Sequence, residues 1–115
     1  MLKKKNRLTS NFQFNVTRKY GQKYEGDCMF VYVLKPLKYS GETRAGIVVP
    51  NKMHKKAVKR NRVKRLFREA LKNYLDKMGR QRWVVIHPKF NCLEKTYEEI
   101  NTDLNKVLQK MSFAD

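Results

Sequence analysis

The sequence predicts an α+β fold in which helices cover a single layer of β-sheet. Three segments rich in β-branched and aromatic residues alternate with three segments of helical periodicity, in the order α-β-β-α-β-α, with room for one further short strand near the first two. No internal repeat or low-complexity linker divides the 115 residues, so we predict one domain, residues 1–115. A hydrophobic content of 41% indicates a folded core rather than a disordered tail.

The first helix is predicted to begin after Ser10. Ser10 and Gln13 have the spacing of a capping box, and Gly21 is a suitable stop. Phe14 and Arg18 are expected on a different face from the buried stripe. Three residues at helical spacing form that expected stripe: Phe12, Val16 and Tyr20.

Three strands are predicted from apolar runs that end at proline. Residues 28–35 end before Pro36, residues 43–50 end at Pro50, and residues 82–88 form a continuous apolar run typical of a strand buried on both faces. Turn-forming residues between the first two runs suggest that these two strands pair as a hairpin.

The segment 55–74 predicts an amphipathic helix, and it carries nine Lys or Arg residues against one acid, Glu69. At about 100° per residue, its apolar side chains gather on one side. They are Val63, Leu66, Phe67, Ala70, Leu71 and Tyr74. The opposite side is nearly pure in basic residues, with Asn61, Lys64, Arg65, Arg68 and Lys72.

The last helix is predicted to follow a second capping box, formed by Thr96 and Glu99. Its apolar stripe fixes the face that should be buried. The stripe consists of Ile100, Leu104, Val107, Leu108 and Met111.

The charge of the chain is its least ordinary property: 27 basic residues oppose 10 acidic ones, for a net charge of +17. Self-repulsion of this size weakens a compact state, which favours a polyanionic partner, either nucleic acid or an anionic membrane. Like charges at i,i+4, as in Lys64–Arg68 and Arg68–Lys72, disfavour a helix in isolation but suit one that meets phosphates. The alternative interpretation is a face that is merely solvated, but such faces usually mix both signs of charge.

The arginines of the basic helix favour nucleic acid over membrane. Planar guanidinium groups at Arg60, Arg62, Arg65 and Arg68 can take a phosphate through two hydrogen bonds and can stack on bases. A membrane-surface helix would need a broader apolar face, and no run approaches the roughly 20 apolar residues of a membrane span. We therefore expect no membrane partner.

The compartment is predicted to be the cytoplasm. The basic start MLKKKNRLTS is not followed by the apolar region of a signal peptide. Cys28 and Cys92 lack the paired spacing of a zinc site or a redox motif, so we expect two free, packed thiols rather than a disulfide.

The acidic residues do not predict an active site. Metal-dependent phosphodiester hydrolysis needs several converging carboxylates, whereas the densest group here, Glu98, Glu99 and Asp103, lies at the start of a helix. His54 and His87 have no evident carboxylate or cysteine partner. We therefore predict no catalytic residue of the chain's own, and the sequence leaves any metal position unknown.

Aromatic residues interleaved with basic ones predict a second binding surface, between the first helix and the sheet. Grooves of this kind bind single-stranded nucleic acid by stacking on rings while cations follow the backbone; the same rings could instead be core. The candidates are Phe14, Arg18, Lys19, Tyr20, Phe30 and Tyr32.

Beyond these patterns, residues 43–74 resemble the protein subunit of bacterial ribonuclease P, whose hallmark is a strand, a basic loop and then AV-x-RNR-x-KR-x-x-RE. The matching positions are Ala57-Val58, Arg60-Asn61-Arg62, Lys64-Arg65 and Arg68-Glu69. The resemblance extends over nearly the whole chain, through RLTSNFQFNVTRKYG, RWVVIHP and TYEEINTDLNKVLQK. It implies an αβββαβα fold with a four-stranded sheet, similar to a ribosomal protein domain. The family's β-α-β crossover is left-handed, against the usual rule.

The resemblance also implies a function. The family's ribonucleoprotein enzyme, an endonuclease, removes the 5′ leader from precursor tRNA and leaves a 5′ phosphate. Its catalyst is the RNA subunit with Mg²⁺ ions, and the protein binds that RNA and the single-stranded leader. No obligate protein partner is evident. Carried over by position, the contacts to the RNA subunit would be Lys52, Lys56, Arg60, Asn61, Arg62, Lys64, Arg65, Arg68 and Lys72.

The leader would meet Phe14, Arg18 and Tyr32, although the family usually has an aromatic residue where Arg18 stands. A charge contact would there replace stacking. Two alternatives remain open: a structural RNA-binding protein of ribosomal type without a role in tRNA processing, and a ribonuclease that works without RNA. Pro50, Met53 and Lys55 also depart from the family pattern, which leaves the conformation of their loop open.

Overall fold

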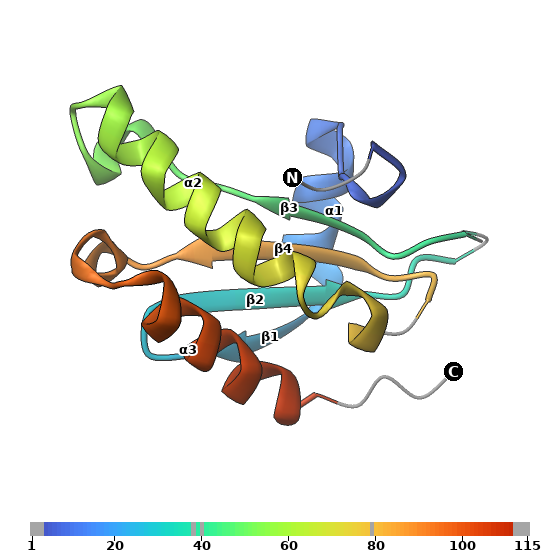
Figure 1. Cartoon of the computed structure of the whole chain (residues 1–115). Helices are drawn as coiled ribbons and strands as arrows, with labels where there is room; N and C mark the ends of the chain where they lie inside the picture. The colour runs from blue at the N-terminus through green and yellow to red at the C-terminus, as the bar shows by residue number, and fades with distance from the viewer. Residues whose placement is uncertain (1–3, 38, 40, 79, 112–115) are drawn as a thin grey trace.

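The computed structural model describes residues 4–37, 39, 41–78 and 80–111, which form one four-stranded mixed sheet with helices on both faces (Figure 1). Helices α2 and α3 cover the face seen in front, and α1 lies behind the sheet. The predicted α+β class is confirmed. The strands are β1 (Gln22–Glu25), β2 (Met29–Leu34), β3 (Arg44–Ile47) and β4 (Trp83–Pro88). The α-helices are α1 (Asn11–Tyr20), α2 (Ala57–Lys72) and α3 (Tyr97–Gln109).

The strand order is β1-β2-β4-β3, with β4 at the centre of the sheet. β4 pairs antiparallel with β2 and parallel with β3, so the predicted hairpin between the second and third strands is wrong. Of the four strands, β4 has the most buried side chains, and its position between β2 and β3 buries both of its faces, as its continuous apolar run predicted. β2 instead forms a hairpin with β1.

β1 is the fourth strand, and apolar patterning does not find it. Its sequence is QKYE, and its side chains are exposed apart from the half-buried Tyr24. An edge strand with charged residues is a common protection against unwanted pairing with another chain.

Helix α2 connects the two parallel strands β3 and β4, which makes a β-α-β crossover. In Figure 1 both strands run from right to left, α2 crosses in front of them, and β4 lies below β3. That arrangement is left-handed, as the resemblance implied, and opposite to the hand found in about 98% of such units.

A large hydrophobic cluster fills the space between the sheet and the helices α2 and α3. From α2 it takes Val63, Phe67, Ala70 and Leu71, with Leu66 and Tyr74 packed against it, so the predicted apolar face is confirmed. From α3 it takes Ile100, Leu104 and Val107, with Leu108 and Met111 packed beside them. A smaller cluster on the α1 side contains Leu8, Trp83 and Val85.

Both ends of α1 and the start of α3 are as predicted, but α1 is rotated relative to the expected stripe. Both capping boxes form, at Ser10 and at Thr96. Phe12 and Tyr20, which were expected to be buried, are 69% and 66% exposed, and the buried residue of α1 is Thr17. Its hydroxyl donates to the carbonyl of Gln13 at 2.8 Å, so a small side chain can face the sheet with its polar atom satisfied.

The end of α1 packs closely against β2. A Cβ at Gly21 would lie 2.4 Å from the carbonyl oxygen of Thr17 and 2.8 Å from that of Val33 in β2. The helix can therefore approach the strand this closely only with glycine at that position.

Both cysteines are free and buried, as predicted. Burial raises the pKa of the Cys28 thiol to about 12, with a further contribution from its hydrogen bond to Asp103. Burial also raises the pKa of Cys92 to about 11. Neutral, inaccessible thiols of this kind behave as small apolar groups.

Candidate nucleic-acid interface

The outward face of α2 carries a stripe of four exposed residues, which we call the outer stripe: Asn61, Arg65, Arg68 and Lys72. Their spacing of four, three and four residues places them one above another on the helix surface. Within the described ranges, Lys64, Arg65, Arg68 and Lys72 make no hydrogen bond or ion pair through their side chains. The cations of this face are therefore uncommitted.

Two other arginines of the predicted site are engaged within the protein. The guanidinium of Arg60 donates to the carbonyl oxygen of His54 at 2.5 Å, and that of Arg62 donates to the carbonyl oxygen of Lys95 at 3.3 Å. Both side chains are half-buried. The structure thus divides the predicted set, with Arg60 and Arg62 away from the outer stripe.

The start of α2 adds positive potential. The cap residue Lys56 offers no side-chain hydrogen bond, and the first turn contains no acid to offset the helix dipole. Lys52 lies in the short 3-10 helix η2 (Asn51–Met53), and both lysines are exposed. The imidazole Nδ1 of His54 accepts the backbone N–H of Lys56 at 3.0 Å, which gives this histidine a structural role.

The other face of the sheet, under α1, brings together the three predicted leader contacts. The ring of Phe14 lies over Gly46 of β3, where a Cβ would lie 2.3 Å from the Phe14 Cζ atom. Phe14 and Tyr32 both pack against the smaller hydrophobic cluster. Arg18 reaches this surface from the same helix, and its guanidinium also donates to Asn15 at 2.5 Å.

His87 joins this group, and sequence reasoning missed it. Its ring meets the ring of Tyr32 edge to face, with centroids 5.5 Å apart, and its Nε2 lies 3.3 Å from Nη1 of Arg18. Because a guanidinium only donates, Nε2 is the acceptor and the imidazole is neutral. Burial lowers the pKa of His87 first, and the charges of Arg18 and Lys23 lower it further.

A lysine pair extends this surface along β2. The ammonium groups of Lys23 and Lys89 lie 4.3 and 4.7 Å from the ring centroid of Phe30. Lys89 also pairs with Glu25 at 2.5 Å. The period of two in strands places Phe30 and Tyr32 on one face of β2, and the same alternation in β4 could have located His87.

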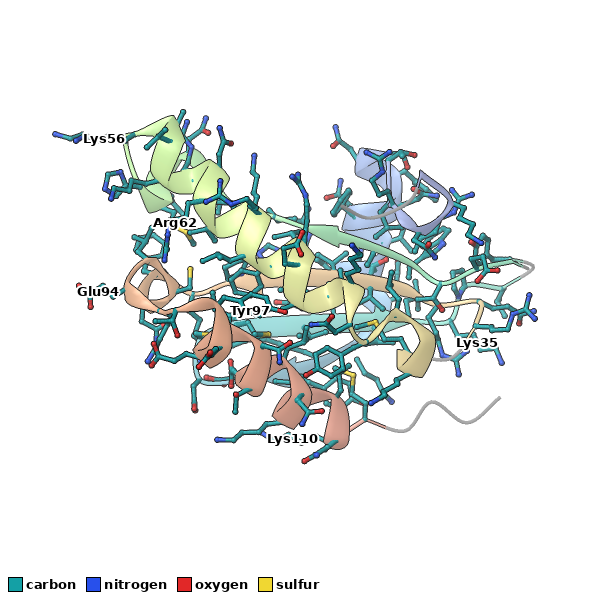
Figure 2. All side chains as sticks on the ribbon, in the orientation of Figure 1. Lys35, Lys56, Arg62, Glu94, Tyr97 and Lys110 are labelled. Carbon is teal, nitrogen blue, oxygen red and sulfur yellow. The ribbon has the colours of Figure 1, made fainter. Side chains whose placement is uncertain are left out.

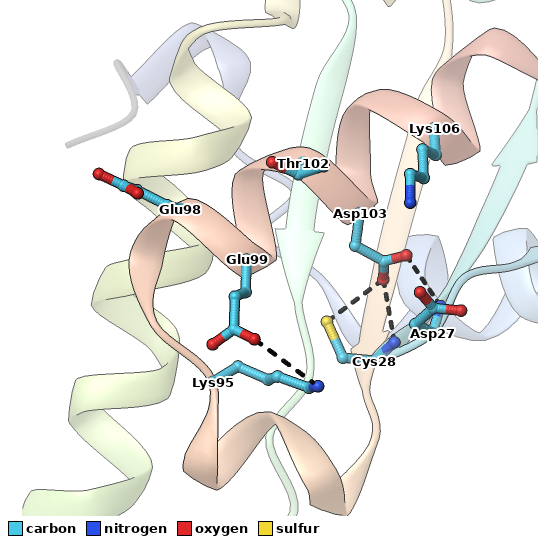
Figure 3. A pocket seen from close by; sticks show the side chains of 8 residues that line it. All are labelled: Asp27, Cys28, Lys95, Glu98, Glu99, Thr102, Asp103 and Lys106. Atoms are coloured by element: carbon cyan, nitrogen blue, oxygen red, sulfur yellow. Dashed lines mark hydrogen bonds and ion pairs between the residues drawn. The ribbon is translucent and has the colours of Figure 1, made fainter.

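A shallow pocket lies beside the start of α3, and two of the three acids named there, Glu99 and Asp103, have structural partners (Figure 3). Glu99 accepts the backbone N–H of Thr96 at 3.0 Å and lies 3.9 Å from the ammonium of Lys95. Asp103 accepts the backbone N–H groups of Asp27 and Cys28 at 2.8 and 2.9 Å. Among the described residues, no group of three or more His, Cys, Asp or Glu could hold a metal ion. Nor is any described helix both long and apolar enough to cross a bilayer.

Fold and surface together define a class: small, strongly basic α+β proteins whose crossover helix exposes uncommitted cations. Comparison with known proteins makes this specific. The family model described as Ribonuclease P matches residues 2–112. The ribonuclease P protein component of Rippkaea orientalis is 34% identical over 112 residues, which cover 95% of this chain and 88% of that protein. That of Bacillus mycoides is 33% identical, with 95% and 93% covered.

A solved structure agrees in fold. The ribonuclease P protein of Staphylococcus aureus superimposes with a TM-score of 0.81 at 24% identity, covering 96% of this chain and 98% of that one. The chain belongs to the ribonuclease P protein family. This family comprises the protein components of ribonuclease P, a ribonucleoprotein of tRNA processing.

Proposed function

We propose that the chain is the RNA-binding subunit of the endonuclease that removes the 5′ leader from precursor tRNA, and that it contributes binding rather than bond cleavage. The observation that carries this proposal is the outer stripe with its uncommitted cations on α2. Like charges at i,i+4 spacing destabilise a helix, and RNA phosphates would remove that cost.

The catalytic RNA subunit is the partner proposed for this side of the molecule. Arg65 and Arg68 of the outer stripe are free to form paired hydrogen bonds with phosphate oxygens, and Lys72 would add a point charge. The resemblance implies a wider set of contacts, of which Arg60 and Arg62 already donate to carbonyl oxygens within the protein. The other members of that set are Lys52, Lys56, Asn61, Lys64, Arg65, Arg68 and Lys72.

The single-stranded leader is the partner proposed for the α1 side. Phe14 and Tyr32 are half-buried rings on one surface, and Arg18 lies beside them. Bases could stack on ring surface while Arg18 and Lys23 follow the phosphates. Contacts to the leader would favour precursor over mature tRNA, because only the precursor carries that segment.

Bond cleavage is assigned to the RNA. Mg²⁺ ions held mainly by the RNA would activate the attacking water and stabilise the leaving oxygen. Glu99 and Asp103 are engaged in helix capping and in holding the β1–β2 turn, so we assign them no part in the chemistry. The protein would assist at low Mg²⁺ by supplying positive charge and by holding the substrate. We place this activity in the cytoplasm.

One experiment tests the proposal. The chain is added to a bacterial ribonuclease P RNA with precursor tRNA at low Mg²⁺, beside reactions that contain RNA alone and protein alone. We expect leader removal to be faster with both components and absent with protein alone. A structural RNA-binding protein of ribosomal type would give no acceleration, and cleavage by the protein alone would indicate a self-sufficient ribonuclease.

A further inference from the structure

We infer that Arg60 and Arg62 are positioning residues, which fix the segments on either side of α2, and that phosphate binding by this helix belongs to the outer stripe. This inference rests on the proposed function, since it divides the residues of that same site into two groups. Both arginines are part of the RNR motif. The sequence alone does not distinguish their role in RNA binding from that of Arg65 and Arg68.

Helical phase separates the two arginines from the outer stripe. Arg60 precedes the buried residues Val63 and Phe67 by three and seven positions, so it lies on the flank that turns toward the core. Arg62 precedes Leu66 by four positions and lies on the opposite flank. Phosphates that contact Arg65 and Arg68 face the outer side of the helix, away from both flanks.

Arg60 ties the loop before α2 to the helix. Its Nη1 donates to the carbonyl oxygen of His54 at 2.5 Å, while Nδ1 of His54 accepts the N–H of Lys56 at 3.0 Å. One residue of the loop is thus held through both its main chain and its side chain. The side chain of Met53 is buried on the core side. Together these contacts set the direction in which Lys52 and Lys56 project.

Arg62 ties α2 to the start of α3. Its Nη2 donates to the carbonyl oxygen of Lys95, the residue just before the α3 cap Thr96. Figure 2 shows Arg62 pointing from α2 toward the loop that leads into α3, whereas Lys56 points away from the protein. The charge of Arg62 also opposes the rise in pKa of the nearby Cys92 thiol, which agrees with this position over η4 (Phe90–Glu94).

Substitution by lysine separates positioning from charge. Lysine keeps the positive charge but has a flexible ammonium group in place of the planar guanidinium. It therefore cannot reproduce the geometry of the hydrogen bond that the guanidinium donates to a backbone carbonyl. The four variants are Arg62→Lys and Arg62→Ala, with Arg65→Lys and Arg65→Ala as matched controls on the outer stripe. Two quantities are measured for each: amide hydrogen exchange of residues 92–97 in the free protein, and the salt dependence of binding to the ribonuclease P RNA.

For Arg62, we expect exchange at 92–97 to accelerate by about threefold to tenfold in both variants. The slope of log affinity against log salt concentration should stay at the wild-type value, because no phosphate contact is lost. For Arg65→Ala we expect unchanged exchange and a slope that falls by about 0.7 to 0.9, the value of one phosphate contact. Arg65→Lys should match the wild type in both measurements.

The inference is overturned if Arg62→Ala flattens the slope as much as Arg65→Ala while exchange at 92–97 is unchanged. It is also overturned if Arg62→Lys leaves exchange at the wild-type rate, and this readout needs only the free, folded protein. Failure of the proposed function looks different, because the wild type itself would then show a shallow salt dependence. Arg60→Lys with exchange at 52–57 provides the same test for the loop.

Discussion

Asp103 shows how a single buried carboxylate can organise a turn. It is 5% exposed, and its two oxygens accept the backbone N–H groups of Asp27 and Cys28 as well as the thiol of Cys28. These groups belong to the turn between β1 and β2, so one side chain of α3 holds the edge hairpin against the helix.

We predict that Asp103→Asn destabilises the protein by about 2–3 kcal/mol. The amide group would place donors against backbone donors, so at least one buried N–H loses its acceptor. Urea denaturation measures the free energy of unfolding. Glu98→Gln, an exposed change on the same helix, is the control and should stay within about 0.5 kcal/mol of the wild type. Equal stabilities for Asp103→Asn and the control would contradict this account of the turn.

His87 predicts a pH dependence of stability near neutrality. Its pKa is lowered in the folded state, so folding favours the neutral ring. The stabilising contribution is therefore present above the unfolded pKa of about 6.5 and is lost as pH falls through the lower folded value. Protonation would also turn Nε2 into a donor opposite the guanidinium of Arg18.

The measurement is the free energy of unfolding between pH 7.5 and 5. We expect it to decline for the wild type and to be flatter for His87→Gln. The carboxyl groups of Glu25 and Glu99, whose pKa values are lowered by their partners, titrate below this window. Identical pH profiles for the two proteins would refute the role given to the ring.

At the residue scale, local sequence rules predicted the helix caps. They did not predict side-chain hydrogen bonds that depend on tertiary contacts. Capping at Ser10 and Thr96 depends on residues three positions apart, so the sequence contains the whole motif. The engagement of Arg60 and Arg62 depends on carbonyl groups of His54 and Lys95, whose positions follow only from the folded chain.

At the scale of elements, the strong periodic patterns were sufficient for α2, α3, β2 and β4. The pairing of strands was not, because an apolar run does not specify its neighbour, and proximity in sequence wrongly favoured a hairpin between β2 and β3. β1 has no apolar pattern, and the exposed Phe12 and Tyr20 show that an apolar stripe on a short helix does not fix its rotation. The predicted handedness of the crossover came from the family resemblance, since a general rule would have given the opposite.

We predict that α1 and α2 have separable roles. Phe14→Ala should weaken binding of precursor tRNA by the holoenzyme about tenfold while changing the affinity for mature tRNA little, since stacking of one base contributes about 1–3 kcal/mol. Phe12→Ala, an exposed ring on the same helix, is the control and should behave as the wild type. The double change Arg65→Ala, Arg68→Ala should instead weaken assembly with the RNA subunit.

These affinities can be measured by equilibrium binding of labelled tRNA and of labelled RNA subunit. Gly46→Ala offers an independent probe, because a Cβ there would displace the ring of Phe14 without removing it. Equal effects of the α1 and α2 variants on both RNAs would contradict the division of roles.

At the scale of the whole molecule, the net charge of +17 and the fold have complementary functions. The two hydrophobic clusters hold a sheet whose opposite faces each support a helix that carries part of the proposed binding surface. Charge alone predicted a polyanion but not which one, whereas the ordered RNR motif and the family match restrict it to the ribonuclease P system. In the proposed function, the RNA subunit cleaves the bond and the protein binds the RNA subunit and the substrate.

The salt dependence of binding to the ribonuclease P RNA tests this central claim most directly. If the outer stripe and its neighbours contact about six to ten phosphates, affinity should fall by roughly 10³–10⁵ between 50 and 200 mM salt. The slope for the Arg65→Ala, Arg68→Ala protein should be smaller by about 1.4 to 1.8. An affinity that changes less than about tenfold over this range, with the same slope in the double variant, would show that α2 is only a solvated face.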